Sequence, residues 1–190
     1  TDIPDVTGVG IKNVGPAVIA GAKKIGADPG NALAIVGTES GFNPHAAAPK
    51  GSAKGLYQFI DSTWEGMKKI YGKKYGIDPN AHQFDAKASV ILGAQLIKDS
   101  EKEIKSVKAN PNPVDLYMLH FLGPTGGRKF LRNLANNPDA PAEPEFKASA
   151  EKNPTIFFDG TRKRTYQEIY NIMANRLIKN ARAAGVEINM

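Results

Sequence analysis

The stretch GTESGFNPHAAAPKGSAKGLYQFIDSTW, residues 37–64, decides the fold of this chain. It continues an apolar run, LAIV, and holds one carboxylate, Glu39, before the next one at Asp61. Apolar neighbours and the negative end of a helix both favour the neutral form of a carboxyl group. A carboxyl group that stays protonated near neutral pH can act as a general acid. A lone Glu near a helix end is nevertheless most often a plain surface residue, so its sequence neighbours decide its role.

A helix is predicted directly before Glu39. Asp28 and Pro29 are typical of an N-cap and of a first helical residue, so we expect a helix from Pro29 to near Gly41. The following residues, 43–60, are rich in Pro and Gly and predict a loop or a small ribbon after Glu39.

The rest of the chain is also predicted to be helical. Apolar residues recur at helical spacing, and two capping-box patterns mark helix starts. The capping-box pairs are Ser62 with Glu65 and Thr165 with Glu168. The further predicted helices lie over residues 16–25, 62–69, 85–107, 113–122, 126–134 and 165–181. The pattern predicts a mainly α fold, with one globular domain of about seven helices over residues 14–190 and an irregular arm over residues 1–13.

The composition limits the classes of function. The chain has 190 residues, of which 41% are hydrophobic and 23% charged, as in ordinary globular domains. No apolar run approaches the ~20 residues that cross a bilayer, so no membrane span is expected. There is no cysteine, and the histidines are too dispersed to predict a metal site. The net charge of +6 favours an anionic partner, of which nucleic acid and the bacterial wall are two examples. Because the basic residues are dispersed, no specific nucleic-acid binding is expected.

Three motifs follow one another along the chain: ES at residues 39–40, GLYQ at residues 55–58 and YMLHFLG at residues 117–123. In this order they resemble the motifs of the lytic transglycosylases, the lysozyme-like enzymes that cleave peptidoglycan. The resemblance spans roughly residues 15–175 and extends to the versions found in bacteriophage endolysins and virion-associated wall enzymes. It implies a lysozyme-like fold with the glutamate of the first motif as the catalytic residue.

The resemblance also implies that Glu39 carries the reaction alone. It protonates the glycosidic oxygen between N-acetylmuramic acid (MurNAc) and N-acetylglucosamine (GlcNAc), then takes the proton of the C6 hydroxyl that attacks C1. The product is a 1,6-anhydro-MurNAc end, and the chemistry requires neither a metal nor an organic cofactor. Most glycosidases use two carboxyl groups, and the absence of Asp and Glu from residues 40–60 fits the route with one. Two alternatives stay open: a muramidase of the same fold that uses water, and a non-catalytic wall-binding module of a virion.

The same motifs suggest residues that bind the sugar chain. Ser40 is expected to hydrogen-bond locally beside Glu39, and Gln58 to serve an acetamido group or the backbone. Tyr57 and Phe59 are candidates for stacking on a sugar ring. Because side chains alternate along an extended stretch, only one of these two rings is expected to point outward.

Two positions depart from the family pattern. The family often has a serine where this chain has Ala48, so Ser52 either supplies that hydroxyl or is a plain loop residue. The tyrosine of the third motif aligns with His120, while Tyr117 lies one helical turn earlier. Residues three apart share a helix face, so either ring or both are expected to face the sugar.

The resemblance to phage enzymes implies a biological setting. We expect a phage-encoded enzyme that acts in the bacterial periplasm or cell wall, during lysis or entry. It is either a free endolysin or part of a virion. Its expected partners are the glycan strands of peptidoglycan and, in a particle, other virion proteins.

Overall fold

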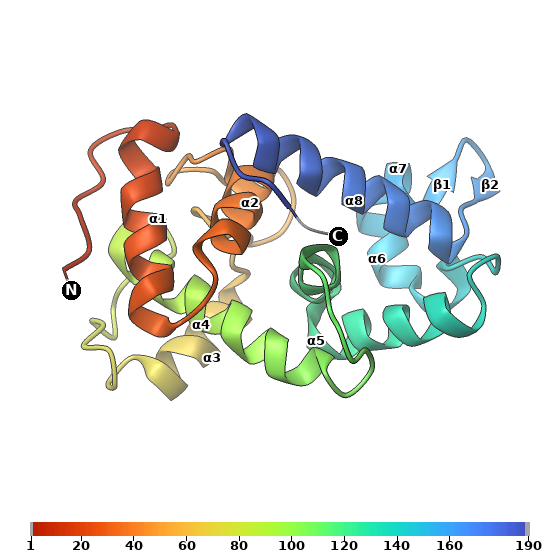
Figure 1. Cartoon of the computed structure of the whole chain (residues 1–190), viewed down its shortest axis with the longest axis horizontal. Helices are drawn as coiled ribbons and strands as arrows, with labels where there is room; N and C mark the ends of the chain where they lie inside the picture. Colours follow the sequence, from red (N-terminus) through yellow and green to blue (C-terminus); the bar gives the residue numbers. More distant parts are fainter. Residues whose placement is uncertain (1, 189–190) are drawn as a thin grey trace. The chain divides into compact units, whose positions relative to one another are not determined.

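The computed structural model describes residues 2–188, which fold into two compact units. The first unit comprises residues 2–99 and 180–188, and the second comprises residues 100–179. The described part of the chain is mainly helical, as predicted, and its one sheet has two strands (Figure 1). No helix within it is long and apolar enough to cross a membrane. The helices are α1 (Ile11–Ile25), α2 (Pro29–Ser40), α3 (Asp61–Tyr71), α4 (Ala86–Ile104), α5 (Pro113–Asn136), the 3-10 helix η1 (Glu143–Glu145), α6 (Lys147–Lys152), α7 (Pro154–Phe157) and α8 (Tyr166–Ala183).

Helix α1 begins earlier than predicted. The backbone N–H groups of Asn13 and Val14 both donate to the carbonyl of Gly10, which starts the helix at Ile11. The helix was predicted to begin at Pro16, but Pro16 lies inside it. Residues 11–13 are therefore helical, while the division of the chain into an arm and one domain stays a prediction.

Helix α2 has the predicted ends. The carboxylate of Asp28 accepts a hydrogen bond from the N–H of Asn31 at 3.1 Å, and Pro29 occupies the first turn. Gly41 closes the helix in the left-handed conformation, with φ 59°. Between these ends residues 32–37 are all buried, so α2 is a core helix and not a one-sided surface helix.

Helix α3 starts differently from the prediction. It begins at Asp61, and its N-cap, Ile60, provides no side-chain hydrogen bond. The capping-box pattern of Ser62 and Glu65 is not used, so this prediction is wrong. The reason is that Ser62 already lies inside the first turn, where its hydroxyl cannot cap the helix that contains it.

The core of the first unit is built on aromatic rings. Phe59 lies 6.2 Å from Tyr57 and 5.2 Å from Trp64 between ring centroids, and all three residues are buried. The ring of Tyr57 lies directly on Gly93 of α4, where a Cβ atom would come within 2.2 Å of the ring. The absence of a side chain at Gly93 therefore makes room for Tyr57.

In the second unit, α5 is one helix with a kink. The helix begins at Pro113, as predicted, and Asn112 and Asp115 form a capping box at its start. Asp115 is fully buried, pairs with Lys108 at 2.7 Å and accepts a hydrogen bond from the hydroxyl of Tyr170 at 2.8 Å. Gly123 has a non-helical backbone, with φ 79° and ψ 164°, so the two helices predicted here are two segments joined at this kink.

The C-terminal part combines a confirmed helix start with elements that were not predicted. Thr165 and Glu168 form the expected capping box of α8, with hydrogen bonds of 2.9 and 3.1 Å. The hydrogen bonds from Arg162 lower the pKa of Glu168 to about 2. The hairpin β1 (Phe158–Asp159) and β2 (Arg162–Lys163), like α6 and α7, was missed because such short elements show no periodic pattern.

Replacing Gly93 with Ala is expected to destabilise the first unit. The added Cβ meets the buried ring of Tyr57, so the core must shift at a cost of about 1–3 kcal/mol. The matched control, Gly66→Ala, adds the same methyl group to α3 where nothing lies within 4 Å. It is expected to stabilise by about 0.5–1 kcal/mol because Ala favours a helix more than Gly does. Urea unfolding, followed by the fluorescence of Trp64, the one Trp of the chain, measures both; equal midpoints would contradict this packing.

Candidate active site

Glu39 lies in the last turn of α2 and is half-buried. The hydroxyl groups of its two neighbours turn back to the helix: Thr38 donates to the carbonyl of Ala34 at 2.8 Å, and Ser40 donates to the carbonyl of Val36 at 3.0 Å. The local hydrogen bond expected of Ser40 is therefore present. These two bonds tie the backbone on both sides of Glu39 to the buried helix.

The chain reverses immediately after this turn. Gly41 and Phe42 are both left-handed, each with φ 59°, a conformation that a bulky residue rarely adopts. Burial and a hydrogen bond hold Phe42 there. Its ring lies over Gly37, with 7% of the residue exposed, and its carbonyl accepts a hydrogen bond from Gly10 at 3.0 Å. The sequence analysis missed Phe42, because no sequence pattern marks a non-glycine residue in this conformation.

Residues 43–60 form the predicted loop with a small ribbon. Lys54 bridges Ala47 on one side and Phe59 on the other in antiparallel fashion. Gln58 is left-handed, with φ 53°, and its amide nitrogen donates to the carbonyls of Ala46 at 3.1 Å and Gly55 at 2.9 Å. Of the two uses expected for Gln58, its amide nitrogen thus serves the backbone. Within residues 2–188 its amide oxygen accepts no hydrogen bond.

The rings of Tyr57 and Phe59 both point into the core. They are 0% and 2% exposed, so the expectation that one of them points outward is wrong. Alternation along this stretch fails because Gln58 between them is left-handed and not extended. The buried rings of Tyr57 and Phe59 therefore anchor the loop in the core.

Ser52 has a structural partner. Its hydroxyl accepts a hydrogen bond from the N–H of Asp61 at 3.0 Å, so a residue of the preceding loop caps α3. Asp61 itself accepts hydrogen bonds from Gln83 at 2.6 Å and from Lys54 at 3.1 Å. Two hydrogen bonds hold the pKa of Asp61 below its usual value. The one from Gln83 has the larger effect, and the one from Lys54 has the next largest. A carboxylate that stays ionised in this way is a poor proton donor.

Tyr117 and His120 belong to the second unit and lie on α5. Tyr117 is buried, with 1% of the residue exposed, whereas His120 is half-buried. Of the two rings, His120 therefore has the more accessible surface. Their roles toward a sugar stay predictions.

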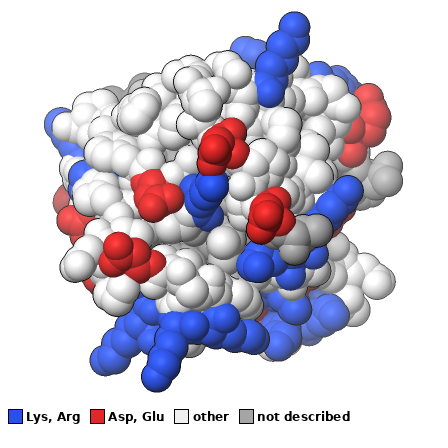
Figure 2. All heavy atoms as spheres, turned by 90° about the vertical axis from the view of Figure 1, so that its left-hand side faces the viewer, with Lys and Arg blue, Asp and Glu red and all other residues white. Residues whose placement is uncertain are grey.

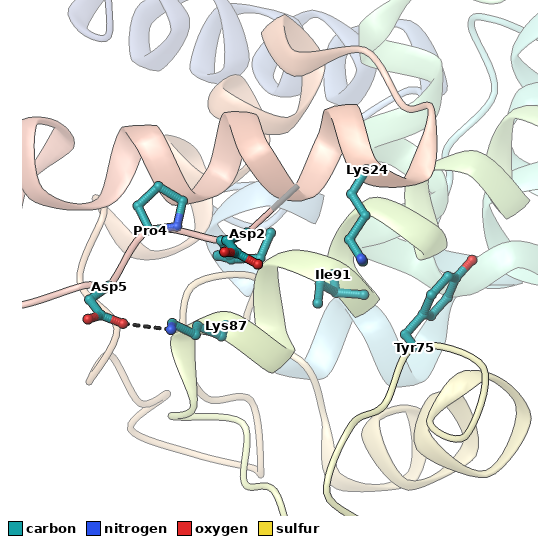
Figure 3. Close-up of a pocket in the computed structure, with 8 residues that line it drawn as sticks. Asp2, Pro4, Asp5, Lys24, Tyr75, Lys87 and Ile91 are labelled. Atoms are coloured by element: carbon teal, nitrogen blue, oxygen red, sulfur yellow. Dashed lines mark ion pairs between the residues drawn. The ribbon is translucent and has the colours of Figure 1, made fainter.

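A hollow in the first unit does not coincide with the predicted site. The N-terminal segment lines it together with Lys24 of α1, Tyr75, and Lys87 and Ile91 of α4 (Figure 3). An ion pair of 2.6 Å between Asp5 and Lys87 lies at this hollow. None of the predicted site residues lines it. Residues 2–188 also contain no cluster of three or more His, Cys, Asp or Glu side chains that would hold a metal ion.

The first unit thus presents a half-buried carboxyl group at the end of a core helix, beside a loop that its own polar side chains hold in shape. Together with the mainly helical fold, this feature fits a lysozyme-like domain. The family described as transglycosylase SLT domain matches residues 16–115, more than half of the chain. The chain therefore belongs to this family, which comprises lytic transglycosylases acting on peptidoglycan. The match includes Glu39 and the loop through Gln58, whereas Tyr117 and His120 lie beyond it.

Ser52 and Ser62 can be compared directly for their contribution to the start of α3. Ser52→Ala removes the acceptor for the N–H of Asp61 and is expected to lower the free energy of unfolding by about 0.5–2 kcal/mol. Ser62→Ala is expected to change the free energy of unfolding by less than about 0.5 kcal/mol. The capping-box pattern alone would predict a larger loss of stability for this variant. Denaturant unfolding followed by Trp64 fluorescence measures both. A larger loss for Ser62→Ala than for Ser52→Ala would contradict the observed helix start.

Proposed function

We propose that Glu39 acts alone as the proton donor and acceptor in cleaving the bond between MurNAc and GlcNAc, with formation of 1,6-anhydro-MurNAc. The observation that carries this proposal is the placement of Glu39, half-buried in the last turn of α2 and followed by a fixed chain reversal. No other carboxylate occurs in residues 40–60, and the next one, Asp61, is held by Gln83 and Lys54.

The reaction balances with one carboxyl group. Glu39 donates its proton to the glycosidic oxygen as the bond from that oxygen to C1 of MurNAc breaks. The N-acetyl group of the substrate meets the positive charge that develops at C1. The Glu39 carboxylate then accepts the proton of the C6 hydroxyl as the C6 oxygen bonds to C1. Glu39 is protonated again at the end, and no water is consumed.

Other residues hold this arrangement and contact the sugar. The two hydrogen bonds from the amide nitrogen of Gln58 fix the loop, which leaves its amide oxygen to accept from an acetamido N–H of the substrate. Ser40 fixes the backbone beside Glu39. His120, which has the more accessible ring, contacts the sugar. Tyr117 is buried and contributes to the packing of α5.

A muramidase of the same fold is the second candidate, because the family is lysozyme-like and the first proton transfer is common to both reactions. In that enzyme water, in place of the C6 hydroxyl, attacks C1 and gives a reducing MurNAc end. It would need a base to activate that water. The engagement of Asp61 with Lys54 and Gln83 argues against this residue as the base.

A phage setting is proposed on the sequence motifs GLYQF and HFLG. The enzyme would act in the bacterial periplasm or cell wall, as a free endolysin during lysis or with other virion proteins during entry. Immunoblotting of purified particles and of the lysate separates the two routes. Protein in the particles supports entry, protein in the lysate alone supports lysis, and a chromosomal gene outside any prophage would contradict both.

Glu39→Gln is expected to lower the rate of muropeptide release from purified peptidoglycan by about 10²–10⁴-fold, because the amide cannot donate or accept the proton. Glu151→Gln makes the same chemical change at an exposed site in α6 and is expected to leave the rate unchanged. Circular dichroism confirms that both variants are folded. A Glu39→Gln variant that retains full activity would contradict the proposal.

The products are expected to resist borohydride. Reducing MurNAc ends, which a hydrolase forms, take up hydrogen on borohydride reduction, whereas 1,6-anhydro ends do not react. Mass spectrometry of the muropeptides before and after reduction therefore separates the two candidates. Products that mostly shift in mass would favour the muramidase.

A further inference from the structure

The C-terminal end of α3 carries an outward face on which one apolar side chain stands among lysines. Lys69, Ile70, Lys73 and Lys74, called here the α3 tip, are all exposed. Ile70 is 69% exposed, more than any other large apolar residue in the described part of the chain. Single exposed apolar residues are common, so the lysines around Ile70 and the way the segment is held decide what this surface does.

The backbone places these residues on one face. Helix α3 ends at Tyr71, but Gly72 keeps helical angles, and the N–H of Tyr75 donates to the carbonyl of Tyr71 at 3.1 Å. Ile70 and the two following lysines, 73 and 74, therefore have the spacing of neighbours on one helical face. The α3 tip is thus a continuous surface.

The opposite face fixes its orientation. Trp64 and Met67 are buried, and the hydroxyl of Tyr71 donates to Asp99 of α4 at 2.7 Å. The hydroxyl of Tyr75 donates to Gln95, also on α4, and the rings of Tyr71 and Tyr75 stack with centroids 6.1 Å apart. Since the tyrosines are anchored to α4, the α3 tip is held facing outward without further ordering.

The three lysines of the α3 tip form no ion pair with any of the described residues, although the Nζ of Lys74 lies 5.4 Å from the centroid of the Tyr75 ring. Lys68, next to them, differs: it pairs with Glu65 at 3.1 Å and donates to the carbonyls of Pro79 and Ala81. Figure 2 shows several Lys and Arg side chains gathered in the lower part of its view.

Helix stability alone does not account for this surface. Lysines in the last turn of a helix interact favourably with its negative end, which explains Lys68 and Lys69. Lys73 and Lys74 lie beyond the last residue of α3, and an exposed Ile70 brings no stability to the fold.

We propose that the α3 tip docks the enzyme onto the surface of an anionic lipid membrane. The ammonium groups of Lys69, Lys73 and Lys74 lie against lipid phosphates, and Ile70 enters the boundary between headgroups and acyl chains. Ile70 favours a membrane over a hydrated polyanion such as nucleic acid, because only the membrane removes its side chain from water. The contact is peripheral and reversible, and it is independent of the chemistry at Glu39.

Sedimentation of the full chain with vesicles tests the docking. Vesicles of phosphatidylglycerol and phosphatidylcholine are expected to bind the protein, whereas vesicles of phosphatidylcholine alone are not. Lys73→Glu with Lys74→Glu is expected to weaken binding by at least about tenfold. Lys147→Glu with Lys152→Glu makes the same charge change at exposed positions of α6 and is expected to weaken it by less than about twofold. Equal loss in both pairs, or no preference for anionic vesicles, would overturn the proposal.

Ile70 provides the test against a general polyanion site. Ile70→Ser is expected to weaken vesicle binding about three- to tenfold while leaving the affinity for a single-stranded DNA oligonucleotide unchanged. Because the chain has no cysteine, Ile70→Cys takes a single polarity-sensitive dye, whose emission is expected to shift to the blue on anionic vesicles. The same dye at Lys147→Cys is expected to show no shift. Full vesicle binding by Ile70→Ser, or tighter binding to DNA than to vesicles, would overturn the membrane assignment.

Discussion

The reversal of the chain at Gly41 and Phe42 is the constraint on which the placement of Glu39 depends. A bulky residue in the left-handed region costs on the order of 1 kcal/mol or more. The structure offsets this cost by burying the ring of Phe42 over Gly37 and by a hydrogen bond from Gly10 to its carbonyl. Helix α1, which begins next to Gly10, thereby helps fix the turn that follows the carboxyl group. A strained backbone beside a reactive group is a recurrent feature of active sites.

In the loop after this reversal, polar side chains form hydrogen bonds and an ion pair that hold the loop and the start of α3. Gln58 fixes two loop carbonyls, Ser52 caps α3, and Lys54 pairs with Asp61. A catalytic group needs rigid surroundings that hold it in a productive geometry. Asp61 is the first carboxylate after Glu39 in the sequence. Its hydrogen bonds lower its pKa, so it stays ionised and does not act as a proton donor. The proposed attack by a hydroxyl of the substrate needs only one acid from the protein.

Local chemistry predicted the fold well, and tertiary contacts account for what it missed. Asp28 and Gly41 fixed the ends of α2 because capping depends on a few adjacent residues. The start of α3 was misplaced because its cap, Ser52, comes from nine residues before Asp61. The inward turn of both loop rings was missed because the left-handed backbone of Gln58 has no sequence signal. The motif containing Glu39 located the candidate catalytic residue, but residue type alone left the roles of Gln58 and Ser52 open.

The measurement that tests the central claim most directly is digestion of purified peptidoglycan in water enriched in ¹⁸O, followed by mass spectrometry of the released muropeptides. If Glu39 moves the proton of the C6 hydroxyl and no water attacks C1, the new MurNAc ends contain no ¹⁸O. Incorporation of one ¹⁸O atom at each new end would show that water is the nucleophile. That result would contradict the single-carboxylate transglycosylase and require a second base.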